Sequence, residues 1–154
     1  MRHVPAEVPL TGGRITSGVV RVAGTVRRPA TEASAFVARL LTHLERRRFT
    51  GAPRHLGQDA AGRDLFSYVP GWVPDRFRRW SDTQVAAAGV LLRSLHDATR
   101  GSGLTGGHPV VCHHDPGPNN TVFRAGLPVA FIGPPCSTPS STASPATSGG
   151  GRSA

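Results

Sequence analysis

Asp115 and Asn120 have the side chains and the spacing that transfer of a phosphoryl group requires. They lie five residues apart in a turn-rich stretch between apolar runs. A carboxylate can orient an attacking hydroxyl group and accept its proton, and an amide oxygen can bind a magnesium ion that neutralises phosphate charge. In that chemistry Asp115 would be the catalytic base and Asn120 the metal ligand, and His113 would hold the loop in place.

Two plainer interpretations of this segment stand beside the catalytic one. Asp and Asn are frequent in turns for local reasons, because their short side chains hydrogen-bond to the nearby backbone. Cys112, His113 and His114 are adjacent and suggest a metal site, but a structural zinc site needs four ligands at defined separations and no second Cys/His cluster occurs in the sequence. We therefore expect the histidines to be structural.

The segments before the motif alternate between short strands and amphipathic helices. A hairpin is predicted over Gly18–Arg28, with its turn at Ala23 and Gly24. Residues 31–48 follow with apolar side chains at helical spacing, which are Phe36, Val37, Leu40, Leu41 and Leu44. The three arginines at 46–48 suit the negative end of the helix dipole.

The second half of the chain continues the same alternation. Residues 51–74 are predicted as strand, turn and strand, with the stronger strand over Asp64–Val69. Ser81 and Gln84 have capping-box spacing at the start of an apolar helix that extends to residue 99. Residues 120–132 read as strand, turn and strand, with the turn at 125–126.

This order of elements, together with His113-x-Asp115-x-x-x-x-Asn120, resembles the aminoglycoside phosphotransferase family, which shares the protein-kinase-like fold. The resemblance covers about residues 10–132 and is closest at VVCHHDPGPNNTVFRAGLPVAFI, LLRSLHDAT and GVVRVAGTVRRP. It implies an α+β, protein-kinase-like fold. Residues 1–71 would form a β-rich N-terminal lobe that binds nucleotide, and residues 72–132 a partial helical C-terminal lobe with the catalytic loop.

The resemblance also implies the cofactors ATP and Mg²⁺ and a small hydroxylated acceptor molecule. The segment with Gly13 and Gly18 would cover the phosphates. The chain contains no lysine, so Arg27 aligns with the cation that usually contacts the phosphates, and a guanidinium can bind them with different geometry. Tyr68 and Val69 would lie in the linker between the lobes, where backbone groups bind adenine.

Gly133 departs from the family pattern, because an aspartate that binds the second magnesium is expected there. No Asp or Glu follows Asp115, and residues 133–154 consist mainly of Ser, Thr, Pro, Gly and Ala. Such a tail is predicted to be disordered, and its abrupt start suggests a truncated or frameshifted reading frame. Catalytic activity is therefore doubtful, and the alternative is an inactive pseudokinase or a fragment.

The composition and the net charge bear on whether the protein binds nucleic acid or a membrane. The chain has 154 residues and a formal net charge of +9, which keeps a nucleic-acid-binding module as the least favoured alternative. The arginines are spread out without the interleaved aromatics of a stacking platform, so we expect no nucleic-acid partner. With two cysteines, no apolar leader and no membrane-length apolar run, we expect a cytoplasmic protein that binds no membrane.

Overall fold

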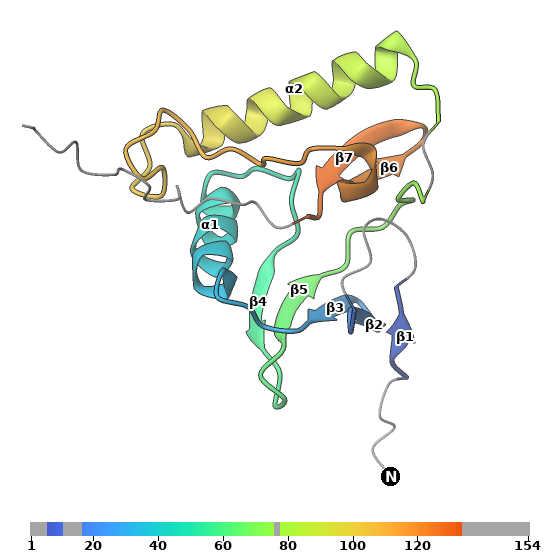
Figure 1. Cartoon of the computed structure of the whole chain (residues 1–154), viewed down its shortest axis with the longest axis vertical. Coiled ribbons are helices and arrows are strands. Elements are labelled where there is room, and N and C mark those ends of the chain that lie inside the picture. Colours follow the sequence, from blue (N-terminus) through green and yellow to red (C-terminus); the bar gives the residue numbers. More distant parts are fainter. Residues whose placement is uncertain (1–5, 11–16, 76–77, 134–154) are drawn as a thin grey trace, which may run out of the picture.

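The computed structural model describes residues 6–10, 17–75 and 78–133. They form a five-stranded antiparallel sheet, two helices and a separate hairpin (Figure 1). The sheet order is β1-β2-β3-β5-β4, with the strands β1 Val8–Pro9, β2 Val20–Val22, β3 Thr25–Arg28, β4 His55–Gln58 and β5 Asp64–Ser67. The remaining elements are α1 Ser34–Arg46, α2 Asp82–Thr99, the short 3-10 helix η1 Pro118–Asn120, β6 Thr121–Arg124 and β7 Leu127–Phe131.

The α+β class and the order of a β-rich N-terminal part followed by a partly helical C-terminal part are confirmed. The tail predicted to be disordered, apart from Gly133, lies outside the described residues. The domain boundaries stay a prediction. Among the described residues, no helix combines the length and the apolar character that crossing a membrane requires.

The predicted hairpin forms from β2 and β3. Ala23 has a φ of 52°, which fits the tight turns that join antiparallel strands, and the Thr25 hydroxyl donates to the carbonyl of Val22. β3 then pairs with β5, with Val26 opposite Phe66 and Arg28 opposite Asp64. The predicted strand over Asp64–Val69 ends at Ser67 in the structure, because the chain turns away toward Pro70, which has no N–H to donate.

The core lies between α1, the sheet and the C-terminal elements. Of the five apolar residues predicted on one face of α1, four are buried and Phe36 packs against them. They contact Phe66 of β5, Leu95 of α2 and Phe131 of β7. One apolar cluster therefore joins the sheet to the helix and the hairpin that follow it.

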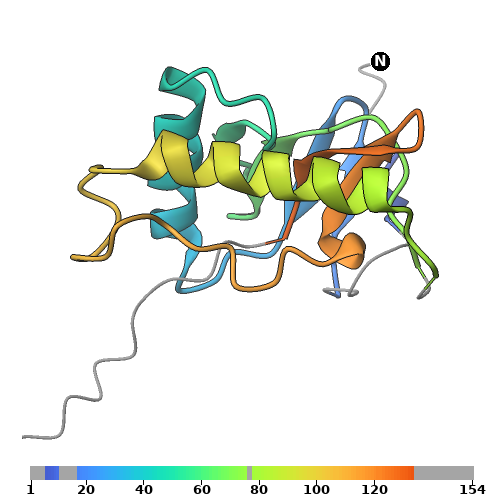
Figure 2. The ribbon, with the colours of Figure 1, turned by 90° about the horizontal axis from the view of Figure 1, so that it is seen from above.

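Helix α2 lies across both α1 and the hairpin (Figures 1 and 2). The predicted capping box is present, since the Ser81 hydroxyl accepts from the N–H of Gln84 and the Gln84 side chain accepts from the N–H of Ser81. The Gln84 amide also donates to the carbonyl of Gly126, in the turn between β6 and β7. The start of α2 is thereby attached to the hairpin.

Candidate functional site

The predicted catalytic pair comes together in the structure. The Asn120 side-chain amide donates to the Asp115 carboxylate at 2.8 Å and to the Asp115 carbonyl at 3.1 Å. Helix η1 sets this geometry, because it turns the chain after Gly117 and places Asn120 at its last position. The N–H of Ile132 donates to the carbonyl of Asn120 at 2.9 Å, so the end of β7 lies against the same loop.

Position 133 also belongs to this site. A Cβ atom placed on Gly133 would lie 2.9 Å from Cγ and 3.1 Å from Oδ1 of Asn120. Because the Asn120 nitrogen is used by Asp115, its oxygen is the atom left to bind a cation. The resemblance predicts an aspartate at 133, but its Cβ would lie so close to Asn120 that the Asn120 side chain would have to shift. The structure therefore places position 133 against the Asn120 side chain, and the catalytic roles of these positions stay predictions.

These groups fit a magnesium ion only in part. Within residues 6–10, 17–75 and 78–133, no cluster of three or more His, Cys, Asp or Glu side chains is placed to hold a metal. Mg²⁺ commonly binds through one or two protein oxygens and takes its other ligands from substrate phosphates and water. Asn120 is therefore suited to a magnesium ion that arrives with a nucleotide rather than to a free ion.

His113 is buried behind the loop. Its side chain is 4% exposed and its ring lies 5.1 Å from that of Phe131, centroid to centroid. Neither ring nitrogen has a hydrogen-bond partner among the described residues, and burial lowers the pKa of His113. Its carbonyl accepts from the N–H of Asp115 at 2.8 Å across His114, which has a φ of 60°. A tight, strained turn of this kind orients Asp115.

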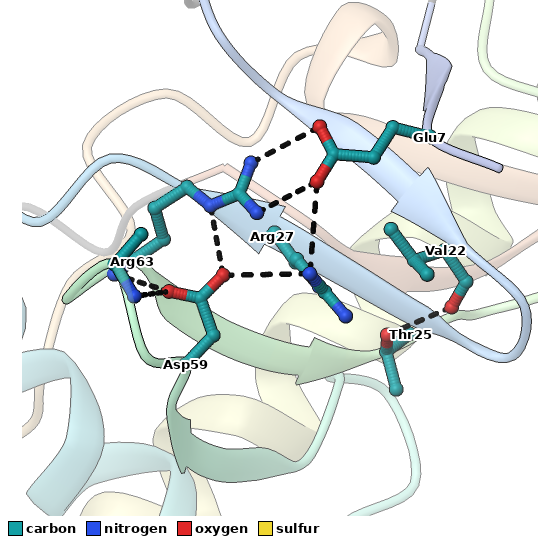
Figure 3. A network of polar contacts seen from close by, with 7 residues as sticks. Glu7, Val22, Thr25, Arg27, Asp59 and Arg63 are labelled. Carbon is teal, nitrogen blue, oxygen red and sulfur yellow. Dashed lines mark hydrogen bonds and ion pairs between the residues drawn. The ribbon is translucent and has the colours of Figure 1, made fainter. Parts of the chain in front are cut away.

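Arg27 lies on the face of the sheet that carries a network of charged side chains (Figure 3). Its guanidinium is 3.6 Å from the carboxylates of both Glu7 and Asp59. Arg63 binds the same two carboxylates at 2.7 and 2.8 Å, and its hydrogen bonds lower the pKa of Glu7 and of Asp59. The network connects Glu7, which directly precedes β1, to Asp59 and Arg63 in the turn between β4 and β5. It also includes Arg27, the cation that was expected to contact phosphates.

Arg28, the next residue along β3, lies on the opposite face of the sheet from Arg27. Adjacent residues of a strand alternate between the two faces. In the register of β3 and β5, Arg28 lies opposite the buried Asp64. With His113 and Gly133, it lines a pocket of about 50 Å³ whose other walls are apolar. The apolar lining is formed by Val37, Leu40, Leu41, Leu44, Phe49, Gly51, Ala52, Pro53, Phe66, Leu95, Phe131 and Ile132. The alternation of burial along β5, in which Asp64 and Phe66 are buried and Leu65 and Ser67 are less so, appears only in the structure, so the sequence offered no signal that distinguishes the two arginines.

The other predicted nucleotide contacts are described in part. Gly13 lies outside the described residues. Gly18 has a φ of 84°, and the N–H of Leu10 donates to the carbonyl of Val19; that this segment covers phosphates stays a prediction. The N–H of Tyr68 donates to the carbonyl of Gly24 at 2.9 Å, and its ring lies under the Arg21 guanidinium.

Val69 differs from Tyr68 in the hydrogen bonding of its backbone. Among the described residues, it forms no backbone hydrogen bond. Of the two linker residues that were expected to bind adenine, Val69 therefore has its N–H and carbonyl available. Whether either residue binds a nucleotide stays a prediction.

The chain is similar to the trifolitoxin immunity protein of Rhizobium leguminosarum bv. trifolii. The two sequences are 37% identical over 142 residues, which cover 82% of this chain and 54% of the relative. The chain thus spans about half the length of that protein. No protein-family model matches the chain, and no solved structure gives a significant match.

Proposed function

We propose that this chain carries the nucleotide-binding and catalytic elements of an ATP-dependent phosphotransferase of the aminoglycoside phosphotransferase type. The observation that supports this best is the contact between Asp115 and Asn120 beside position 133. A turn-forming Asp and Asn would need only their own backbone. Here the carboxylate and the amide face each other, and the end of a following hairpin returns to the same point.

In the proposed reaction, the Asp115 carboxylate orients a hydroxyl group of a small acceptor and takes its proton. The acceptor oxygen forms a bond to the γ-phosphorus, the bond from that phosphorus to the β–γ bridging oxygen breaks, and ADP leaves with the electron pair. Magnesium supplies neutralisation of phosphate charge when it is bound. Asn120 would hold it through Oδ1.

Gly133 sets the level of activity in this proposal. The missing carboxylate removes part of the electrostatic stabilisation of the transition state, a contribution of about several kcal/mol and thus about a hundredfold or more in rate. The chain is therefore proposed to be a slow enzyme. An inactive pseudokinase that binds nucleotide is the alternative that the same geometry supports.

The test measures ATP binding by calorimetry and phosphoryl transfer to a hydroxylated acceptor such as an aminoglycoside, both with magnesium. Asp115→Asn is expected to keep ATP affinity and to lower turnover by about a hundredfold, because a general base contributes roughly that much or more. Gly133→Asp is expected to raise turnover about tenfold by restoring an anionic ligand, with the Asn120 side chain shifting because the new Cβ would otherwise lie 2.9 Å from its Cγ. A wild-type chain that binds no ATP at saturating magnesium would contradict the proposal.

Similarity to an immunity protein favours a second candidate function, protection of a bacterium against a toxin. The relative's name refers to trifolitoxin, and we propose a related protective role for this chain. The test expresses the chain in a trifolitoxin-sensitive strain and measures growth with the toxin. Protection that is lost in Asp115→Asn would mean that the toxin or its target is modified, whereas protection that persists would mean that binding suffices. A strain that stays sensitive would reject this role.

A further inference from the structure

An arginine lies against two tryptophan rings in the segment between β5 and α2. The Arg78 guanidinium is 5.1 Å from the centre of the Trp72 ring and 5.6 Å from the centre of the Trp80 ring. Trp80 stacks on Phe123 of β6, with ring centres 4.8 Å apart and planes inclined by 17°. We call these four side chains the tryptophan cluster. It places three aromatic rings and one guanidinium side by side on the hairpin.

The tryptophan cluster is fixed in the fold and yet partly open to solvent. Trp72 and Phe123 exchange backbone hydrogen bonds, and the Phe123 side chain is buried. Trp72 is nevertheless 46% exposed, and Arg78 is exposed as well. A ring that is held by the backbone and still presents part of its surface is what a stacking platform requires.

Positive charge is concentrated around the tryptophan cluster. Arg79 directly follows Arg78, and Arg124 follows the phenylalanine of β6; all three arginines are exposed. Among the described residues, none of the three has a carboxylate within 4.0 Å. The same segment also carries the exposed Asp75 and Asp82, which the arginines outnumber. With a net charge of +9 for the whole chain, this surface favours a partner that carries several negative charges.

The sequence order hides this arrangement. The arginines are not interleaved with several aromatic residues along the chain, and for that reason no nucleic-acid partner was expected. The bridge between Trp72 and Phe123 brings β6, with Arg124, against the tryptophans from a distant part of the chain. Folding thus assembles the combination of rings and cations that the linear pattern lacks.

We propose that the tryptophan cluster binds single-stranded nucleic acid, with a base stacked on the exposed surface of Trp72 and the neighbouring phosphates against the arginines. Every base has a flat face, so such binding tolerates different sequences. A duplex keeps its base faces in its own stack and offers mainly phosphates. An acidic protein could satisfy the arginines, but its carboxylates provide no flat group for the indole ring. This inference goes beyond the proposed phosphotransferase and does not depend on it.

The test measures binding of oligothymidylate of about 12 nucleotides, a length within the range that single-strand-binding folds cover. Trp72 and Trp80 are the two tryptophans of the chain, so tryptophan fluorescence reports on this cluster alone. The single strand is expected to quench that fluorescence and to bind about tenfold or more tighter than a duplex of the same length. Polyglutamate, the probe for an acidic protein partner, is expected to leave the fluorescence unchanged.

Three variants separate stacking from net charge. Trp72→Leu keeps an apolar side chain and is expected to weaken binding of the single strand about tenfold, while Trp72→Phe retains most of the affinity. Arg78→Gln is expected to weaken binding about fivefold and to reduce the slope of log K against log salt by about 0.7. Arg39→Gln is the matched control, because Arg39 is exposed on α1 and also lacks a carboxylate within 4.0 Å. It should bind within about twofold of the wild type.

Several results would overturn the inference. Equal effects of Arg78→Gln and Arg39→Gln, or equal quenching by polyglutamate, would mean that the surface responds to charge alone. Displacement of the oligonucleotide by saturating ATP and magnesium would place it at the proposed nucleotide site instead. A wild-type chain that binds no oligonucleotide at low salt would also reject it. Thermal unfolding checks each variant, and if Trp72→Leu is not folded, the comparison of Arg78→Gln with Arg39→Gln decides.

Discussion

At the scale of single residues, His113 combines deep burial with ring nitrogens that lack partners among the described residues. Protonation would place a charge against Phe131 in an apolar pocket, which is unfavourable. A neutral imidazole avoids that charge, and its two ring nitrogens carry only the smaller cost of buried polar atoms without partners among the described residues. His113 therefore contacts the proposed catalytic loop through its packing on Phe131 and through its carbonyl, which accepts from the N–H of Asp115; that it holds the loop for catalysis stays a prediction.

This burial predicts a loss of stability in mild acid. The unfolded chain binds the proton near the ordinary pKa of 6.5, and the folded chain binds it less readily. As the pH falls from 7 to 5, the unfolded state takes up more protons than the folded state, so the free energy of unfolding decreases. Urea unfolding at both pH values measures this. His113→Gln should lose less stability than the wild type over this interval, and equal losses would contradict the assignment.

At the scale of elements, the attachment of the sheet to the hairpin depends on the segment after β5. Trp72 and Phe123 exchange backbone hydrogen bonds of 2.9 and 2.7 Å, and the Arg124 guanidinium donates to the carbonyl of Pro70. The ring of Trp80 stacks on Phe123 at 4.8 Å. These contacts fix the hairpin, and with it the catalytic loop, relative to the sheet.

Gly71 is required for this attachment. It has a φ of 147°, and a Cβ there would overlap the Val122 side chain and the Phe123 carbonyl oxygen. Gly71→Ala is expected to lower the free energy of unfolding by about 2 kcal/mol or more, measured by urea unfolding with tryptophan fluorescence.

Gly89 of α2 provides the control for this prediction. A Cβ at that position would meet nothing within 4 Å. Gly89→Ala should therefore stabilise the protein by about 0.5–1 kcal/mol, because alanine favours the helix. A Gly71→Ala variant as stable as the wild type would show that the contact with the hairpin is dispensable.

At the scale of the whole molecule, α2 keeps an apolar surface in contact with solvent. Val85 and Val90 are 61% and 67% exposed, and Ile132 near the end of β7 is 39% exposed. Leu95, by contrast, is buried against the core. The exposed apolar side chains therefore occupy only part of α2, together with Ile132.

Such a surface predicts association of the protein with itself. Replacement of Val85 and Val90 by glutamine keeps the helix and removes the exposed apolar groups, so the variant is expected to stay monomeric at higher concentration. Sedimentation velocity over a concentration series measures this. Ser94→Gln, at an exposed polar position of the same helix, is the control and should behave like the wild type. Equal association of all three proteins would contradict the prediction.

The sequence by itself determined the features that depend on near neighbours. The hairpin turn at Ala23, the apolar face of α1 and the capping box of Ser81 and Gln84 all follow from short-range patterns, because turn geometry, helical periodicity and capping involve residues a few positions apart. The motif of Asp115 and Asn120 was predicted for the same reason, since one short helix brings the two side chains together.

Only the tertiary structure decided which arginine faces the catalytic loop. Arg27 and Arg28 are adjacent and identical in type. Which of them faces the core is set by the pairing of β3 with β5, which lies more than thirty residues further along the chain. A shift of one residue in that register would exchange them. The contact between Gly133 and Asn120 likewise depends on how β7 returns to the loop. Long-range pairing and packing set these relations, and no local pattern contains them.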